Sequence, residues 1–180
     1  MEDKGEGSFV PIFLVMLASL IIAFYWEKID FIKNLVHSVL DPTAGALLNW
    51  NLTLGMLVIV FVIGLITTLV QKYATDQKTL REMKAEQKKL QRDLKKLERG
   101  SKEYQEMTMK SLSFMGPMMK LSMRAMVFTG IPFILFFRWF WDFFNAIPDF
   151  KFLGFLSWFW FYLIFTIIFS SIFRKVFDVV

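Results

Sequence analysis

The chain has 180 residues, of which 56% are hydrophobic and 18% aromatic, whereas soluble domains are about 45–50% apolar. It contains no cysteine and one histidine, which excludes a disulfide framework, a thiolate nucleophile and a cluster of histidine metal ligands. The net charge of +5 is concentrated in one central segment. Together with four long apolar stretches, these features predict an all-α integral membrane protein.

The four apolar stretches are long enough to cross roughly 30 Å of hydrocarbon as helices that rise about 1.5 Å per residue. They are Phe9–Trp26, Leu52–Val70, Ala125–Phe144 and Phe152–Phe173. The first follows an acidic leader and precedes no small-residue cleavage site, so we interpret it as a retained helix rather than a signal peptide. Trp26 at its end is expected to lie in the aromatic belt at the membrane surface.

Lysines and arginines are distributed unevenly among the loops. Residues 71–124 hold 14 of the 21 Lys and Arg together with seven acids. The loop 27–51 holds only Lys28 and Lys33, and the loop 145–151 only Lys151. Because positively charged loops stay in the cytoplasm, we expect a multi-pass protein of the cell membrane whose central segment and two termini are cytoplasmic.

The loop 27–51 is predicted to be an external amphipathic segment. Its apolar residues have helical spacing and indicate a short helix in the membrane interface: Ile29, Ile32, Leu35, Val36, Val39 and Leu40. His37 falls within this helix. Since a lone interfacial histidine more often has no specific function, we expect none for His37.

The segment after Val70 changes to charged heptads. Its a and d positions hold Tyr73, Leu80, Met83, Leu90, Leu94 and Leu97. Arg99-Gly100-Ser101 then interrupts the pattern, and Ser101 is suited to cap a second helix with the same spacing. The pattern predicts a cytoplasmic antiparallel coiled-coil hairpin within residues 71–120, with a first arm of about 28 residues and roughly 40 Å.

Seven basic side chains are concentrated near the predicted tip of this hairpin: Lys84, Lys88, Lys89, Arg92, Lys95, Lys96 and Arg99. One interpretation is a solvated coiled-coil face that also fixes the topology. The other is a contact surface for a polyanion. A tip that projects away from the bilayer lies beyond a Debye length of the headgroups, so ribosomal RNA is the polyanion that we expect.

A run of methionines follows the hairpin. Flexible, polarizable methionines suit a surface that accepts many apolar shapes, which predicts a substrate-accepting role for Met115, Met118, Met119, Met123 and Met126. Packing inside the coiled coil is the alternative, and it fits the position of Met118. Gly116-Pro117 is expected to break or kink the helix here.

Polar side chains gather at the predicted cytoplasmic ends of three spans, whose outer halves are almost purely apolar. They are Thr67, Thr68, Gln71, Arg124, Thr129, Thr166, Ser170 and Ser171. Because intramembrane polar groups are costly without water or a partner, we predict that they line a hydrophilic groove open to the cytoplasm. Bonding of the hydroxyls to their own backbone is the alternative. Arg138, near the outer end of the third span, is expected to extend outward toward Asp142.

The order of these segments resembles a known family over about residues 41–178. A span that ends GLITTLVQKYATDQ (64–77) precedes the hairpin and the methionine run, and the spans GIPFILFFRWFW (130–141) and LSWFWFYLIFTIIFSSIFRK (156–175) follow. This layout is similar to the archaeal YidC-like proteins of the YidC/Oxa/Alb insertase superfamily. Their relatives include the insertase subunit of the endoplasmic-reticulum membrane protein complex.

The resemblance implies a three-helix insertase core, formed by residues 52–70 and 121–178, with the coiled coil between its first two helices. It implies the ribosome, nascent membrane proteins and the lipid bilayer as partners, allows other insertase or translocon subunits, and implies no cofactor. The chain departs from the family in two respects. Leu52–Val70 lacks the arginine of bacterial members, and residues 1–26 are expected to form an N-terminal tail and an extra transmembrane helix outside the core.

We therefore expect a membrane protein insertase or chaperone that works without nucleotide hydrolysis, since the sequence has no GxxxxGK[ST] loop. An oligomeric ion channel or small transporter is the alternative, but it requires a polar stripe through the full depth of a span. A passive scaffold whose hairpin pairs with another coiled coil is a third hypothesis. An enzyme is least favoured, because Asp142 and Asp149 have no partner base or metal ligands in the sequence pattern.

Overall fold

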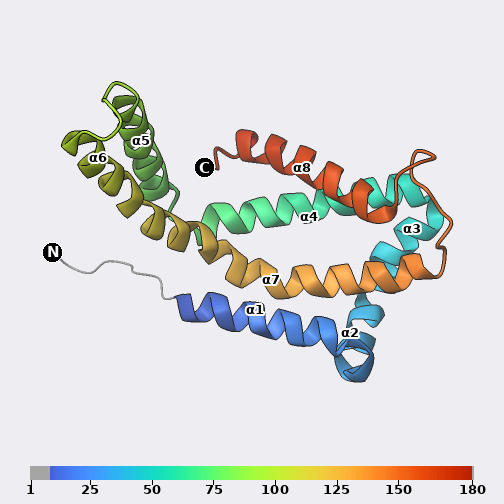
Figure 1. The fold of residues 1–180 in the computed structure, drawn as a ribbon. Helices are drawn as coiled ribbons and strands as arrows, with labels where there is room; N and C mark the ends of the chain where they lie inside the picture. The colour runs from blue at the N-terminus through green and yellow to red at the C-terminus, as the bar shows by residue number, and fades with distance from the viewer. Residues whose placement is uncertain (1–8, 180) are drawn as a thin grey trace.

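The computed structural model describes residues 9–179, without the side chains of Phe9 and of residues 124–126. This part of the chain is all-helical, as predicted, and Figure 1 shows the course of its helices. A 3₁₀ helix (η1) and a π-helix (η2) lie among the α-helices. In chain order the elements are α1 (Phe9–Phe24), η1 (Trp26–Lys28), α2 (Asp30–Leu40), η2 (Asp41–Gly45), α3 (Ala46–Trp50), α4 (Leu52–Ala74), α5 (Gln77–Leu94), α6 (Lys102–Ser113), α7 (Met115–Asn145) and α8 (Trp158–Val176).

Three helical stretches of the described chain are long and apolar enough to cross a membrane. They are Leu52–Ala74, Val127–Asn145 and Trp158–Val176. The second and third predicted spans are thereby confirmed, with ends that shift by a few residues. The last span begins at Trp158 rather than at Phe152, so this predicted boundary is wrong.

A tight turn takes the place of the predicted start of α8. Phe152 and Leu156 exchange backbone hydrogen bonds of 2.7 and 2.9 Å. Between them, Leu153 and Gly154 have positive φ angles of 54° and 83°. Left-handed residues cannot continue an α-helix, so α8 starts only after this turn. The ring of Phe152 is buried in the protein core instead of facing lipid.

Helix α1 corresponds to the first predicted span but has only 16 residues, which give it a length of about 24 Å. It packs along α7, where Gly130 permits a close approach: a Cβ there would lie 3.0 Å from Cγ1 of Val15. Trp26 follows in η1 and is only 1% exposed, so its predicted place in an aromatic belt is wrong. Its indole N–H donates to Asp142 over 2.7 Å, and this tertiary contact draws the ring inward.

Helix α4 lies in the middle of the bundle, with α7 on one side and α8 on the other (Figure 1). Gly64 of α4 faces Phe169 and Phe173 of α8, and an added Cβ would be 3.5 to 3.7 Å from their side chains. Since α1 packs on α7, the order across the bundle is α1, α7, α4 and α8.

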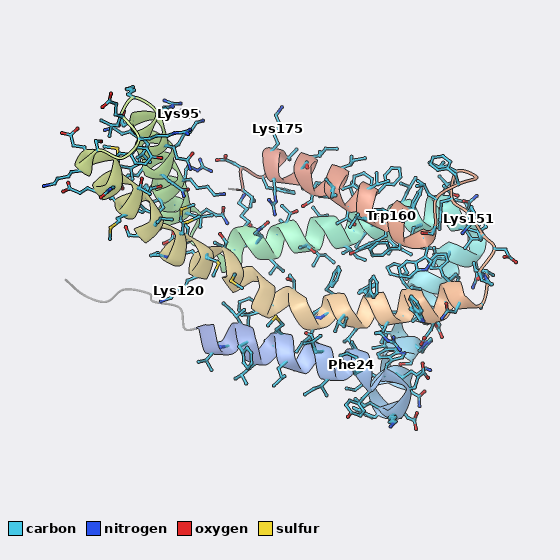
Figure 2. All side chains as sticks on the ribbon, viewed as in Figure 1. Phe24, Lys95, Lys120, Lys151, Trp160 and Lys175 are labelled. Atoms are coloured by element: carbon cyan, nitrogen blue, oxygen red, sulfur yellow. The ribbon has the colours of Figure 1, made fainter. Side chains whose placement is uncertain are left out.

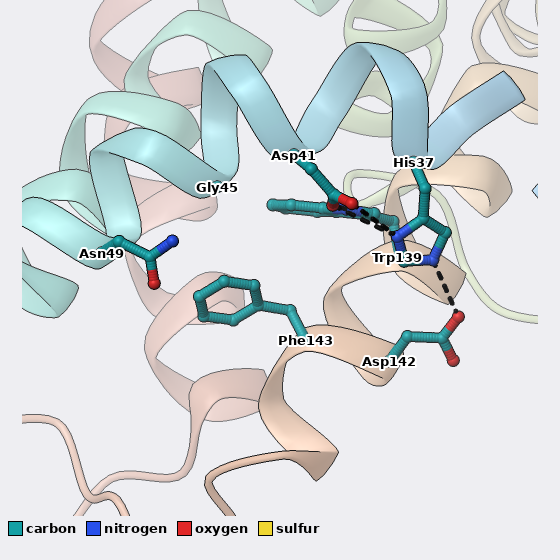
Figure 3. A pocket seen from close by; sticks show the side chains of 7 residues that line it. All are labelled: His37, Asp41, Gly45, Asn49, Trp139, Asp142 and Phe143. Atoms are coloured by element: carbon teal, nitrogen blue, oxygen red, sulfur yellow. Dashed lines mark hydrogen bonds and ion pairs between the residues drawn. The ribbon is translucent and has the colours of Figure 1, made fainter. Parts of the chain in front are cut away.

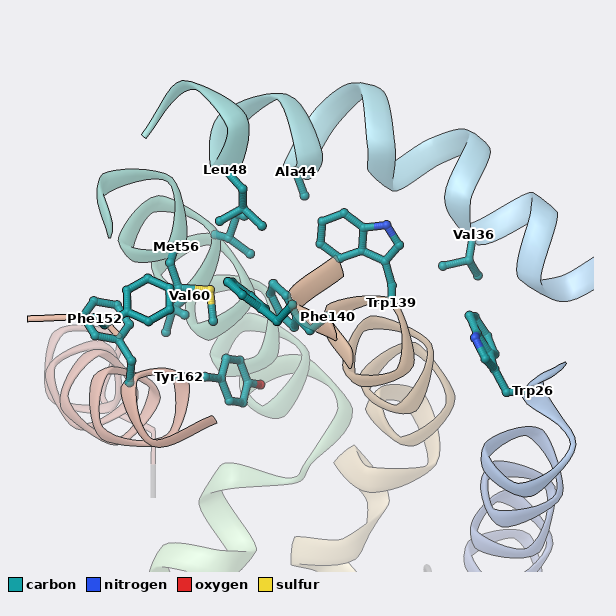
Figure 4. Packing of buried hydrophobic residues seen from close by; sticks show 13 residues of the cluster. Trp26, Val36, Ala44, Leu48, Met56, Val60, Trp139, Phe140, Phe152 and Tyr162 are labelled. Atoms are coloured by element: carbon teal, nitrogen blue, oxygen red, sulfur yellow. The ribbon is translucent and has the colours of Figure 1, made fainter. Parts of the chain in front are cut away.

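An aromatic core closes the end of the bundle where α7 turns into α8 (Figure 4). Phe152 stacks on Phe161 with ring centroids 4.4 Å apart, and Phe144 stacks on Trp158 at 5.7 Å. Leu48 of α3 is buried against this core. This end contains the parts of the spans that the sequence analysis identified as almost purely apolar.

Helix α2 coincides with the predicted amphipathic helix. Its residue Val36 is buried in the core cluster, whereas Phe31, Leu35 and Val39 are exposed. The chain then continues through η2 and α3 to α4. Asn51 caps α4 by accepting a 2.9 Å hydrogen bond from the backbone N–H of Leu54.

Helices α5 and α6 pack side by side at the opposite end of the bundle from α2 (Figure 1). The predicted uninterrupted first arm is wrong, because α4 ends at Ala74, and Thr75 and Asp76 are extended. The carboxylate of Asp76 accepts hydrogen bonds from the N–H and the hydroxyl of Thr79, at 3.1 and 2.7 Å, and these bonds lower the pKa of Asp76. This N-cap starts a new helix, which heptad spacing alone does not reveal.

Helix α5 ends at Leu94, before the predicted interruption at residues 99–101. Its 18 residues span about 27 Å rather than the predicted 40 Å. Turns fill residues 95–101, and Gly100 adopts a φ of 103°. The predicted cap of the second helix is confirmed, since the hydroxyl of Ser101 accepts a 3.1 Å hydrogen bond from the N–H of Tyr104.

A short break at Phe114 separates α6 from α7, two residues before the predicted one at Gly116-Pro117. Pro117 lies in the first turn of α7, where a missing N–H is tolerated. Pro132 lies inside α7 without ending the helix.

Candidate functional site

A cavity of about 260 Å³ lies between α4 and α7, with one residue of α8 in its wall. Three of its eleven lining residues carry a hydroxyl, and the others are apolar. The lining consists of Ile63, Ile66, Thr67, Val70, Phe128, Thr129, Gly130, Pro132, Phe133, Phe136 and Tyr162.

A second hollow of about 470 Å³ shares Ile66, Val70 and Phe128 with this cavity. It continues along α4 to Tyr73 and Ala74, where the chain leaves toward α5. We call the two hollows together the α4–α7 groove. Its wall is open to the surroundings, since Ile66 is 55% and Phe128 63% exposed.

The α4–α7 groove ends at the aromatic core. Phe133 in its wall lies 6.3 Å from the ring of Tyr162, and Phe136 lies 6.1 Å from the ring of the buried Phe140. The groove therefore extends from the hairpin junction to an aromatic end and does not continue through the bundle as a polar path.

The lining contains a backbone feature that the sequence analysis missed. Pro132 has no N–H, so the carbonyl of Phe128 lacks its usual helical donor four residues later. Both Phe128 and Pro132 line the groove, so the carbonyl of Phe128 is a backbone hydrogen-bond acceptor at the part of α7 that forms the wall. A proline inside an apolar span is the sequence signal that points to it.

The structure brings some predicted groove residues together and separates others. Thr67 of α4 and Thr129 of α7 line the same cavity. Thr68 is buried on another side of α4, and its hydroxyl donates a 2.7 Å hydrogen bond to the carbonyl of Gly64. Gln71 is half-buried, and its carbonyl accepts a hydrogen bond from the side chain of Gln77.

The predicted residues of α8 lie outside the cavity lining. Thr166 and Ser170 are half-buried, and Ser171 is exposed with its hydroxyl donating to the carbonyl of Ile167 over 2.7 Å. In their place, α8 contributes Tyr162, which the sequence analysis did not select. Arg124 and Met126 are among the residues whose side chains lie outside the described part of the structure.

The predicted methionine surface lies on the first turns of α7, between the hairpin and the groove. Met115 and Met119 are exposed, and Met118 and Met123 are half-buried. These four residues are not part of the groove lining.

The seven basic residues predicted to contact RNA are all exposed on α5 and the turn that follows. Figure 2 shows this concentration of charged side chains, with Lys95 at the far end of the hairpin from the membrane helices. One of the seven, Lys96, forms an ion pair with Asp93 at 3.1 Å. The set is therefore presented to solvent on one projecting unit.

Arg138 does not extend toward Asp142 as predicted. Its Nη2 atom lies 3.8 Å from a carboxylate oxygen of Glu27, and its guanidinium carbon lies 5.8 Å from the ring centroid of Trp26. The chain segment before α2 thus supplies a closer partner than the next turn of α7. No sequence spacing connects these residues.

Three membrane-length helices around a groove with apolar, exposed walls define a helical integral membrane protein. The chain belongs to the family of integral membrane proteins described as EMC3/TMCO1-like, whose model matches residues 37–180. This family is part of the Oxa1/YidC/Alb3 insertase superfamily. Neither the curated proteins nor the solved structures contain a match to the chain.

Proposed function

We propose that the protein is a membrane protein insertase or chaperone of the archaeal YidC-like type. In this proposal the α4–α7 groove accepts a hydrophobic segment of a nascent protein and releases it laterally into the bilayer. The observation that carries the proposal is a groove with apolar, exposed walls in which Thr67, Thr129 and Tyr162 supply hydroxyls at membrane depth. Membership in an insertase superfamily supports it.

The composition of the groove fits both parts of such a substrate. Burial of its apolar surface against residues such as Ile66 and Phe128 is favourable by about 25 cal/mol per Å². A polar flank that enters the bilayer loses its water, and hydroxyls in the wall partly offset that cost. The aromatic core stops the groove, so the segment leaves sideways between α4 and α7. This route needs no cofactor, nucleotide or covalent chemistry.

The remaining parts of the chain are assigned to delivery. The proposal places the hairpin and both termini in the cytoplasm, because most of the lysines and arginines lie between α4 and α7. The hairpin, paired as an antiparallel coiled coil, contacts ribosomal RNA through its exposed basic residues. The nascent segment then meets Met115 and Met119 before the groove. Helix α1 is a short additional span, accommodated by local thinning of the bilayer.

Site-specific crosslinking with a matched pair of positions tests the proposal. Ile66 in the groove and Ile172 on α8 are both isoleucines, each fourteen residues after the start of its helix, and they are 55% and 50% exposed. Ile172 is absent from the groove lining. A photocrosslinker at position 66 is expected to capture stalled nascent membrane segments, and one at position 172 is not. Equal capture at both positions would contradict substrate binding in the groove.

A further inference from the structure

His37 lies between two carboxylates (Figure 3), on the helix α2 at the end of the bundle opposite the hairpin (Figure 1). Its Nδ1 atom is 3.2 and 3.1 Å from the two carboxylate oxygens of Asp41, and its Nε2 atom is 3.2 Å from Oδ2 of Asp142. Each carboxylate also accepts a 2.7 Å hydrogen bond from an indole N–H, Asp41 from Trp139 and Asp142 from Trp26. The imidazole therefore joins α2 and η2 to α7.

The number of hydrogen bonds that the His37 ring can donate to these carboxylates depends on whether the ring is protonated. A carboxylate only accepts hydrogen bonds, and a neutral imidazole has one N–H and one lone pair. With a neutral ring, one of the two ring nitrogens would present its lone pair to a carboxylate oxygen about 3.2 Å away, which is repulsive. A protonated ring donates from both nitrogens. The observed geometry therefore favours the imidazolium form of His37, which satisfies both contacts.

The charges around His37 lead to the same conclusion. Lys33 of α2 lies 3.8 Å from Asp142 and 2.5 Å from Glu27 of η1. Arg138 of α7 lies 3.8 Å from the same Glu27. With His37 protonated, the positive Lys33, Arg138 and His37 balance the negative Glu27, Asp41 and Asp142. Loss of the proton from His37 leaves this group of side chains with an excess negative charge. Water screens that charge only partly, because the side chains of His37 and Asp142 are only 29% and 16% exposed.

We propose that His37 is a proton-controlled latch that fastens η1 and α2 to the end of α7. While its ring is protonated, His37 bridges Asp41 and Asp142. As the pH rises and the ring loses its proton to water, one bridge becomes repulsive and α2 loosens from α7. Since α1 is covalently joined to η1, the latch links the pH on this side of the membrane to the position of the N-terminal helix. This inference concerns docking and does not depend on the insertase proposal.

Hydrogen exchange in lipid nanodiscs tests the latch, because His37 is the only histidine of the chain. Backbone protection of α2 is measured at pH 5.5 and pH 8.5, relative to intrinsic exchange rates at each pH. Charge-assisted hydrogen bonds are the strong ones, so protection of α2 is expected to fall about tenfold or more at the higher pH. Protection of α8, on the far side of the bundle, is expected to stay constant.

Two variants separate the latch from general pH effects. His37→Gln removes the titrating group and is expected to abolish the difference between the two pH values. The double variant His37→Gln, Asn34→His restores a histidine on an exposed face of α2 and is expected to stay insensitive to pH. If His37→Gln does not fold, Asp142→Asn, which keeps a side-chain oxygen for Trp26, is expected to reduce the pH effect. A pH-independent wild type, or an undiminished pH effect in either single variant, overturns the proposal.

Discussion

The adjacent residues Thr67 and Thr68 allow a sharp test of the groove, because they have the same side chain in different surroundings. Thr67 lines the cavity, whereas Thr68 is buried and bonded to the carbonyl of Gly64. Thr67→Val removes one of the three hydroxyls of the lining without changing its shape. One hydrogen bond is worth about 1 kcal/mol, so a substrate with a polar flank is expected to insert about fivefold more slowly.

The assay measures insertion into proteoliposomes by protease protection, with two substrates that share one apolar segment. One substrate carries a short polar flank that must cross, and the other carries none. The reduction is expected for the first substrate only. Thr68→Val is the control: it loses a buried hydrogen bond and about 1 kcal/mol of folding stability, and the insertion rate is expected to stay unchanged. An equal rate for Thr67→Val and wild type, or an equal loss in Thr68→Val, would refute the reasoning.

Three further predictions concern other parts of the chain. Phe161→Ala, in the fully buried aromatic core, is expected to lower the free energy of unfolding in detergent by about 3–5 kcal/mol, and the partly exposed Phe159→Ala by clearly less; equal losses would contradict the assigned core. The pKa of Asp76 is lowered by Thr79, so its capping contribution is present above the usual aspartate pKa and is lost as the pH falls through the lowered value. Wild-type helicity, measured by circular dichroism, should therefore decrease on acidification more than that of Asp76→Asn, and identical titrations would argue against this cap. Ribosome co-sedimentation at low salt is expected to weaken when the charges of four exposed lysines are reversed, namely Lys88, Lys89, Lys95 and Lys96. An unchanged complex would exclude the RNA contact.

Three of the four predicted spans correspond to membrane-length helices in the described part of the chain, because length and apolarity determine such helices directly, whereas the first corresponds to the shorter α1. The predicted helix boundaries were wrong where the conformation of one or two residues determines where a helix starts or ends. The start of α8 was placed six residues too early because Phe152–Leu156 is as apolar as the helix that follows, and only positive φ angles at Leu153 and Gly154 distinguish it. The break before α5 was missed because heptad spacing continues across Asp76, whose role depends on a local hydrogen bond to Thr79.

The candidate groove was predictable in position but not in composition. Thr67 and Thr129 follow from the depth of polar residues along their spans. The burial of Thr68 depends on how α4 is rotated within the bundle, where Gly64, one turn earlier, packs against Phe169 and Phe173. The surroundings of His37 were not predictable at all. They come from hydrogen bonds to Asp142, more than a hundred residues away in the chain, which no local pattern encodes.

The two extended residues between α4 and α5 have a mechanical consequence. A continuous helix would act as a rigid lever and carry any force on the hairpin straight into α4. Here the joint at Thr75 and Asp76 interrupts that lever, and Arg81 of α5 is instead attached to Asp178 just after α8 by a 2.8 Å ion pair. The hairpin is therefore attached to the tail of α8 as well as to α4 and α7, so a displacement of the hairpin acts on all three membrane-length helices.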